Sequence, residues 1–320
     1  MRILAVDDDN VSLQLLTHFV ENHGAHELTA ANSAQDAIAR LTELGTDYFD
    51  FCFFDIQMPE MNGIELTRYV RRTLQMRDVP IIMLTAMADK NHIDAAFAAG
   101  ATDYVTKPFD SNDLRGRLTL IERLFSAKAA NAAPMAQPVV FNDPIGLSDP
   151  ISIYEVDNVI DHVAMENYAM QLSRAAAFGS STFALAIRDI ESFHAAMSPF
   201  EFHSLISDVA EIVSDAMNGH QFLMSYSGCG VFVCVAERGW TPDVRRLEDR
   251  INLFLARTEL FNNDGERLYV RVSVGRSVRF VWKSGQSVLD ALSKAHDYAE
   301  TARTAFMEGR NEVWTVGQIA

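Results

Sequence analysis

The stretch FCFFDIQMPEMNG, residues 51–63, decides the fold of the N-terminal half of this 320-residue chain. Its first four residues, Phe51–Phe54, are all apolar, and the carboxylate of Asp55 follows them directly. A short run that is apolar at every position is typical of a strand buried on both faces, as strands are in a parallel sheet covered by helices. We therefore expect Asp55 to lie at the carboxyl end of such a strand.

Similar short apolar runs lie on both sides of this stretch, at Ile3–Val6, Ile81–Leu84 and Tyr104–Val105. The segments between the runs carry apolar residues at helical spacing, the first after the cap candidate Asn10 and the second after Asn32 or Ser33. This alternation of strands and helices predicts an α/β fold with a doubly wound parallel sheet.

Polar side chains follow several of these strands. Functional residues of a parallel α/β sheet gather at the carboxyl ends of its strands. In chain order these ends carry Asp7 with Asp8, then Asp55, Thr85 and Lys107. Three carboxylates packed together repel one another unless a hard divalent cation neutralises them, so we expect a Mg²⁺ site. An ammonium and a hydroxyl at the same edge would bind phosphoryl oxygens and leave one carboxylate free as a nucleophile.

With this order and spacing, residues 1 to about 125 resemble the response-regulator receiver domain, which implies a five-stranded parallel sheet. The matching motifs are Val6-Asp7-Asp8, the stretch from Asp55 to Gly63, Thr85-Ala86, and Tyr104 with Lys107-Pro108. The resemblance implies that Asp55 is the phosphoacceptor. It also implies that Mg²⁺ is held by Asp8, Asp55 and the main-chain carbonyl of Gln57, with Asp7 assisting through water.

The same resemblance assigns roles to the other residues of this edge. Thr85 and Lys107 would hold phosphoryl oxygens, and Ala86 would leave access to the site. Tyr104 would be an aromatic switch that fills a cavity opened when Thr85 moves toward the phosphoryl group. The Lys107-Pro108 peptide bond is expected to be cis.

Composition excludes several classes of function. The chain has 27 Lys and Arg against 43 Asp and Glu, a formal charge of −16, and both halves are net negative. It therefore has no general electrostatic attraction to nucleic acid or to an anionic membrane. Its three cysteines cannot form a disulfide framework. The N-terminus lacks the apolar segment of a signal peptide or a membrane span, so we expect a cytoplasmic protein.

The length favours two domains. Residues 128–150 contain small residues and repeated prolines, which cannot pack a core, and they are predicted to be a linker. The predicted domains are therefore residues 1–127 and 151–320.

The second domain is predicted to be a different α/β unit with a mixed sheet. We expect helices at 156–177, 199–217, 242–257 and 287–307, and strands at 183–188, 222–227, 231–235 and 268–278. The two middle strands flank Gly228-Cys229-Gly230, which indicates a hairpin. Four histidines, His162, His194, His203 and His296, lack ligand spacing in the sequence.

Parts of this half resemble the GGDEF diguanylate cyclase family, which implies a nucleotide-cyclase-like fold. These parts are residues 184–193, 273–275 and 309–313. The family signature falls on Gly228, Cys229, Gly230, Val231 and Phe232. Its two acidic positions are therefore a glycine and a valine, and the metal ligands that cyclase chemistry needs are missing.

Two acidic residues, Asp189 and Glu191, remain from the strand motif of that family, and Arg303 is a candidate for its phosphate-contacting lysine. We expect no cyclase activity. The predicted protein is a two-component response regulator, phosphorylated on Asp55, that signals through protein contacts of its degenerate second domain.

Two alternatives remain open. The second domain could be a receptor for GTP or cyclic di-GMP, or it could be a weakly active cyclase that uses Asp189 and Glu191. The expected partners are a sensor histidine kinase or a histidine phosphotransfer protein, and an unidentified protein that receives the output. A homodimer also stays open.

Overall fold

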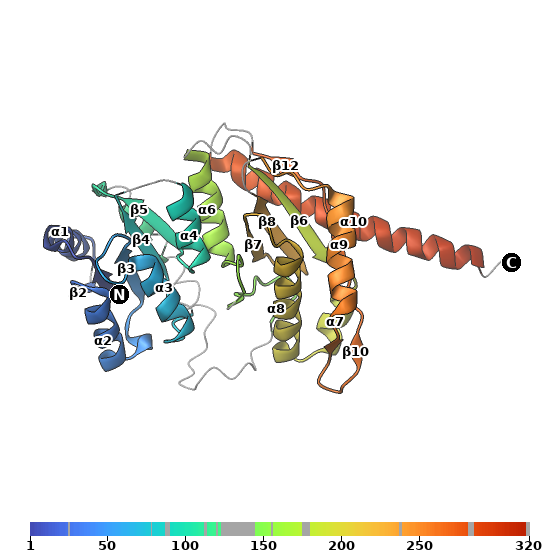
Figure 1. Ribbon diagram of the computed structural model, residues 1–320, viewed down its shortest axis with the longest axis horizontal. Coiled ribbons are helices and arrows are strands. Elements are labelled where there is room, and N and C mark those ends of the chain that lie inside the picture. The colour runs from blue at the N-terminus through green and yellow to red at the C-terminus, as the bar shows by residue number, and fades with distance from the viewer. Residues whose placement is uncertain are drawn as a thin grey trace. The chain divides into compact units, whose positions relative to one another are not determined.

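The computed structural model describes residues 1–24, 26–77, 79–86, 90–111, 114–119, 121–122, 145–154, 156–174, 180–236, 239–280 and 285–317. The chain forms two compact units, Met1–Pro138 and Val139–Ala320, which run from blue to green and from green to red in Figure 1. Most of the predicted linker, residues 128–144, falls outside the described ranges.

The first unit is built on a five-stranded parallel sheet in the order β2-β1-β3-β4-β5, as predicted. Val6 pairs with Phe54, and Asp55 pairs with Leu84, so the carboxyl ends of the three central strands lie at one edge. The elements are β1 (Arg2–Val6), α1 (Asn10–Glu21), β2 (Glu27–Ala31), α2 (Ala34–Leu44), η1 (Thr46–Tyr48), β3 (Phe51–Asp55), α3 (Gly63–Arg72), β4 (Ile81–Thr85), α4 (Lys90–Ala98) and β5 (Asp103–Thr106).

Helices cover both faces of this sheet. Alternate residues of a strand point to opposite faces. Ile3, Phe51 and Phe53 pack with the buried face of α1 and with helical residues of the segment 114–122. On the opposite face, Thr67 of α3 donates its hydroxyl to the sulfur of Met83 in β4 at 3.4 Å. The sheet is therefore doubly wound.

The starts of the helices follow their caps. The side chain of Asp9 accepts hydrogen bonds from the N–H groups of Val11 and Ser12, so Asp9 caps α1, and the predicted cap, Asn10, is instead its first helical residue. Ser33 caps α2, which selects one of the two predicted candidates. The last helix of this unit, predicted from Asp113 to about Lys128, is helical at 114–119 and 121–122, and its remainder lies outside the described residues.

The second unit contains a sheet in the order β11-β6-β8-β7, and β12 also pairs with β6. The pairs between these strands are antiparallel, and one parallel bridge joins Val159 to Met224 at the β7 edge. The elements are α6 (His162–Arg174), β6 (Ser181–Ile187), α7 (Ile190–Ala196), α8 (Pro199–Ala216), β7 (Phe222–Tyr226), β8 (Val231–Ala236), α9 (Val244–Arg257), β9 (Leu260–Phe261), β10 (Arg267–Leu268), β11 (Val272–Val274), β12 (Val278–Arg279) and α10 (Gly285–Gly317).

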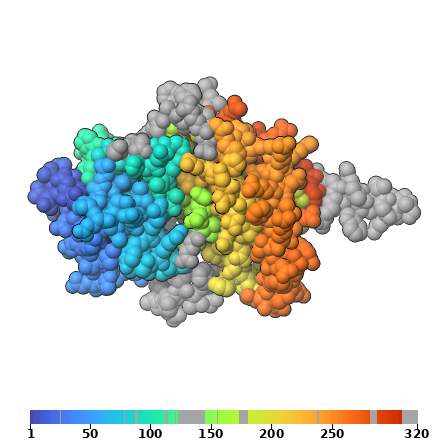
Figure 2. All heavy atoms as spheres, in the orientation of Figure 1, coloured from blue at the N-terminus to red at the C-terminus, as the bar shows by residue number. Residues whose placement is uncertain are grey.

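The two faces of this second sheet are covered by different helices (Figure 1). Phe183, Leu185 and Phe232 pack with α8 and α9 in one large apolar cluster. In Figure 2, atoms of the yellow-to-orange segment that contains α8 and α9 cover this side of the second unit. The residues that alternate with these, such as Val233, face the opposite side, where α6 and α10 lie.

The structure corrects three predicted elements of this unit. The first helix begins at His162 and not near residue 156, because the chain before it pairs with the edge of β7 through the hydrogen bond from Ile160 N–H to the Met224 carbonyl. The strand predicted at 268–278 is divided into β10, β11 and β12. The last helix continues to Gly317, so residues 309–313 lie within α10.

Residues 145–150, predicted as the end of the linker, belong to the second unit and pack against its other residues. The Cys229 N–H donates to the Leu147 carbonyl at 2.7 Å, and Nε2 of His194 lies 2.6 Å from the Ile145 carbonyl oxygen. Among the helices that the structure describes, none has the length and apolar composition needed to cross a lipid bilayer.

Candidate functional site

Three carboxylates and one ammonium meet at the carboxyl edge of the first sheet. Asp7 is fully buried, Asp55 is 2% exposed, and Asp8 is exposed. One oxygen from each carboxylate lies within 4.8 Å of the others. The Nζ atom of Lys107 lies 2.7 Å from Oδ2 of Asp7 and 2.7 Å from Oδ1 of Asp55. Four of the five residues that the sequence assigned to strand ends are therefore brought together here.

The local backbone explains why these side chains converge. Asp7 follows β1, and its Oδ1 accepts a hydrogen bond from the N–H of Asp9, which itself caps α1. Asp55 ends β3, and the chain then turns so that the Gly63 N–H donates to the Ile56 carbonyl at 3.1 Å. A Cβ atom at position 63 would lie 2.1 Å from the main-chain oxygen of Asp55, so this close approach requires glycine.

The electrostatics of the pocket oppose ionisation of Asp55. The pKa of Asp55 is raised to about 6. Burial is the largest cause; the hydrogen bond and charge of Lys107 lower the pKa, and the charges of Asp7 and Asp8 raise it. Burial alone would lower the pKa of Lys107, but its bonds to Asp55 and Asp7 outweigh burial and raise it. One ammonium thus faces three carboxylates, and the imbalance of negative charge fits a divalent cation.

The donor set also fits magnesium. Carboxylate and carbonyl oxygens are the ligands that Mg²⁺ prefers. Gln57, whose carbonyl is the further predicted ligand, lies two residues after Asp55 in the loop that follows β3. Asp7, Asp8, Asp55 and this carbonyl are the groups that would hold the ion.

Thr85 and Ala86, which the resemblance places beside the phosphoryl group, lie at the end of β4 and directly after it. Thr85 ends β4 and is 1% exposed, and its carbonyl accepts the N–H of Lys107 at 2.7 Å. Ala86 is exposed, and residues 87–89 lie outside the described part of the chain. The Lys107-Pro108 peptide bond is cis, as the resemblance implies.

Tyr104 lies in β5 and is 6% exposed. Its ring makes an edge contact with Phe97 of α4, with centroids 6.4 Å apart. The Tyr104 ring is therefore buried against α4 in this structure, and its role as a switch stays a prediction.

The predicted remnants in the second unit form a different arrangement. Asp189 precedes α7 in the left-handed region at φ 56°, and Glu191 lies in the first turn of that helix. Arg303 of α10 donates Nη1 to the Cys229 carbonyl at 2.8 Å, and its Nη2 lies 3.6 Å from Glu191. The Arg303 side chain is 13% exposed, so it is held by protein groups and is not simply solvated.

The hairpin turn that carries the signature positions is closely packed. A Cβ at position 230 would lie 2.7 Å from Cγ1 of Ile190, and one at position 228 would lie 2.3 Å from the main-chain oxygen of Ser148. Within the described residues, groups of three or more possible metal ligands occur at Asp7, Asp8 and Asp55 and in α10 at residues 296–300, and neither includes Asp189 or Glu191.

Sequence reasoning missed Arg188. This residue is 6% exposed, its Nε donates to Oγ of Ser273 at 2.9 Å, and its Nη2 donates to Glu248 at 2.8 Å. Its guanidinium also lies over the ring of Phe306, 3.5 Å from the centroid. An arginine at the end of an otherwise apolar strand was the signal available in the sequence.

Comparison with known proteins agrees with the geometry of the first unit. Residues 3–119 match the family described as response regulator receiver domain. The chain is 34% identical to the chemotaxis protein CheY of Pseudomonas aeruginosa over 125 residues, which are 39% of this chain and 96% of that protein. It is 37% identical to the two-component response regulator ARR12 of Arabidopsis thaliana over 115 residues, which are 36% of this chain and 18% of that one.

A solved structure of the Vibrio cholerae chemotaxis protein CheY4 is also similar. It has 31% sequence identity and a TM-score of 0.35, and the match covers 38% of this chain and 97% of that one.

Proposed function

The chain belongs to the response-regulator family through its receiver domain, residues 3–119, and from this membership we propose that Asp55 accepts a phosphoryl group and that the second unit passes the signal on by contact with another protein. The observation that carries the first part is the buried carboxylate of Asp55, held within 4.8 Å of two further carboxylates and 2.7 Å from an ammonium.

The proposed chemistry follows from this geometry. A carboxylate oxygen of ionised Asp55 attacks phosphorus and forms an oxygen–phosphorus bond. The bond between phosphorus and the donor breaks, and its electron pair leaves with the donor group. A magnesium ion bound by the carboxylates would neutralise charge on the transferring group. Lys107 exchanges its bonds to Asp7 and Asp55 for phosphoryl oxygens, and the Thr85 hydroxyl donates to another. Because the pKa of Asp55 is about 6, most of its carboxylate is ionised above neutral pH.

A receiver domain implies a histidine kinase or a histidine phosphotransfer protein as partner. Phosphorylation adds ~1.5–2 negative charges at the sheet edge. We propose that this charge alters the surface around β5 and α4 and that the change reaches the second unit through the segment between the two units.

The second unit is proposed to be a degenerate cyclase-like domain without catalysis. Its element order, with a strand, two helices, a hairpin, a helix, further strands and a last helix, supports a relation to the GGDEF family. Gly230 and Val231 stand where that family has acidic metal ligands, and Val231 is fully buried. The Arg303 guanidinium is already bonded to Cys229 and Glu191, which supports a role in packing rather than in phosphate binding.

Labelling with radioactive acetyl phosphate and Mg²⁺ tests the receiver assignment. The wild type and the matched control Asp47→Asn, an exposed aspartate outside the pocket, should acquire acid-labile phosphate, and Asp55→Asn should acquire none. Equal labelling of Asp55→Asn would contradict the assignment.

Incubation with GTP and Mg²⁺, followed by nucleotide chromatography, tests the second unit. We expect no dinucleotide from either the unphosphorylated or the phosphorylated protein. A dinucleotide product that disappears with Asp189→Asn would show that the domain is a cyclase after all.

A further inference from the structure

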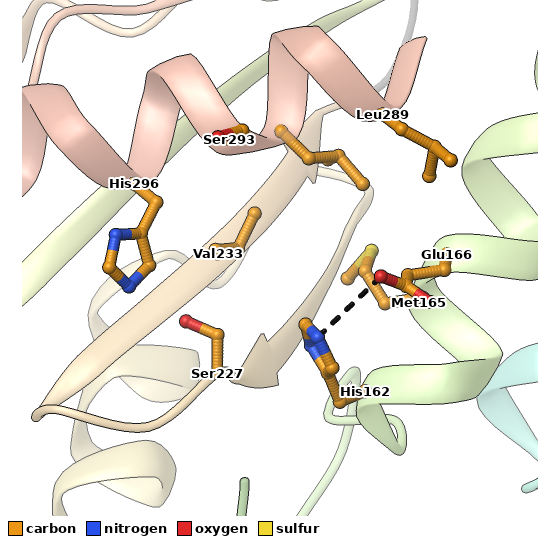
Figure 3. Close-up of a pocket in the computed structure, with 9 residues that line it drawn as sticks. His162, Met165, Glu166, Ser227, Val233, Leu289, Ser293 and His296 are labelled. Atoms are coloured by element: carbon orange, nitrogen blue, oxygen red, sulfur yellow. Dashed lines mark ion pairs between the residues drawn. The ribbon is translucent and has the colours of Figure 1, made fainter. Parts of the chain in front are cut away.

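A cavity of about 240 Å³ lies inside the second unit, between α6, α10 and the β7–β8 hairpin (Figure 3). It is distinct from the signature turn and from Asp189. Its described lining comes from His162, Met165 and Glu166 of α6, from Ser227 and Val233 of the hairpin, and from four residues of α10.

One part of this cavity is apolar. Met165 is fully buried, Val233 is 4% exposed and Leu292 is 8% exposed, and Leu289 lies beside them. A water molecule occupies ~30 Å³ of liquid, so the cavity has room for a ligand about as large as eight waters. That volume suits a single ring with a short substituent.

The other part carries two histidines from facing helices, each with a glutamate four residues later. Nε2 of His162 lies 3.8 Å from Glu166, and Nδ1 of His296 lies 3.8 Å from Glu300. Each carboxylate thus faces one ring nitrogen of the histidine on its own helix. In Figure 3 the His296 ring projects from α10 toward Ser227, and His162 lies below it with its ring turned toward Glu166.

Glu166 is the accessible charged group of this cavity. Its side chain is 47% exposed. Nδ1 of His162 and Oγ of Ser225 have no hydrogen-bond partner in the part of the chain that the structure describes, but both atoms are buried and present no surface to the cavity. The charged contact of a ligand in this cavity is therefore the carboxylate of Glu166.

The charges near the cavity favour a cation. None of its nine described lining residues is lysine or arginine, and Glu166 contributes a carboxylate. Arg303 lies 3.5 Å from Glu300, but its guanidinium also donates to the Cys229 carbonyl. His296 groups with Asp297 and Glu300 within 4.8 Å, whereas His162 belongs to no such group among the described residues, so the two histidines do not share one metal site.

We propose that this cavity binds a small organic cation with an apolar ring, of the amidinium or ammonium class. The N–H groups of the cation donate to the Glu166 carboxylate. The ring lies against Met165, Val233 and Leu292. This proposal is independent of the degenerate-cyclase assignment, because it uses no signature residue.

Three isosteric probes test it on the full chain: benzamidine, benzamide and benzoate, which carry charges of +1, 0 and −1. Binding is followed by NMR of methionine methyl groups, with the Met165 signal assigned from Met165→Leu. We expect benzamidine to shift this signal saturably below ~10 mM, benzamide to bind more weakly, and benzoate not to bind.

Substitutions separate this site from non-specific binding. Glu166→Gln should weaken benzamidine by ~2- to 5-fold, the range for one exposed charge. Ser293→Leu, at an exposed helical position whose side chain would fill the cavity, should abolish the Met165 shift. His220→Gln, an exposed histidine outside the cavity, is the matched control and should bind as the wild type does. The proposal is overturned if benzoate binds as well as benzamidine, if no probe shifts Met165, or if Ser293→Leu binds normally.

Discussion

Replacement of Asp55 by asparagine should stabilise the metal-free first unit near neutral pH, although it removes the proposed phosphoacceptor. Burial raises the pKa of Asp55 to about 6 from its usual 3.8, despite the bond from Lys107. The folded state therefore binds this proton more tightly than the unfolded state does. Stability must fall as the pH rises from about 3.8 through about 6, and it stays reduced above that range.

The magnitude follows from the shift. Roughly two pKa units at about 1.36 kcal/mol per unit give a penalty of ~3 kcal/mol at pH 7.5, and about half of it remains at pH 5. Asparagine cannot ionise and carries no such penalty. Lys107 keeps its 2.7 Å contact to Asp7 in the variant, so the loss of its contact to Asp55 only partly offsets the gain. These values are upper bounds on the stabilisation.

Hydrogen exchange of the full chain in EDTA measures this difference without a two-state assumption. The free energy of opening is taken from urea-dependent exchange of peptides that cover β3, at pH 5 and pH 7.5. The control variant Asp47→Asn lies outside the pocket and should match the wild type at both pH values. The reasoning is refuted if Asp55→Asn is no more stable than the wild type at pH 7.5, or if its advantage does not shrink at pH 5.

Four further outcomes are expected. The affinity for Mn²⁺, followed by electron paramagnetic resonance, should fall ~10-fold from pH 7.5 to pH 5, because about one Asp55 in eleven is ionised at pH 5 and the metal binds the ionised form. Gly63→Ala should destabilise the first unit by ~1–3 kcal/mol by hydrogen exchange, whereas Gly116→Ala, with nothing within 4 Å of its new Cβ, should not. Gly230→Asp should lower the melting temperature and restore no dinucleotide synthesis, since its Cβ would meet α7 at 2.7 Å. Arg188→Met should cost the second unit ~1.5–3 kcal/mol in urea unfolding followed by tryptophan fluorescence, because a charged, buried hydrogen-bond donor is lost.

The edge of the first sheet could be predicted from the sequence because parallel topology forces it. Once Phe51–Phe54 is a central strand, Asp55 must lie beside the residues that follow the neighbouring strands. The start of α1 was harder to place. Asp9 and Asn10 are both good caps, and only the hydrogen bonds from Val11 and Ser12 select Asp9.

The second unit contains features that the local sequence pattern does not predict. The run 268–278 alternates like one strand, but Gly275 interrupts it where α10 passes so close that a Cβ would lie 2.5 Å from the Ala299 nitrogen. His162 and His296 are 134 positions apart, and only the packing of α6 against α10 places both beside one cavity. Arg303 was a candidate for contacting phosphate because nothing in the local sequence reveals its hydrogen bond to the Cys229 carbonyl.

The double contact of Lys107 has a consequence for how the first unit responds to its surroundings. Its ammonium is a tethered counter-ion, present at high effective concentration and bonded to Asp7 and Asp55 at once. It contacts one oxygen of each carboxylate and so competes with a divalent cation for their negative charge. Lys107 therefore raises the concentration of free cation that half-saturates the site, and Lys107→Met should lower this concentration while also weakening the binding of phosphate.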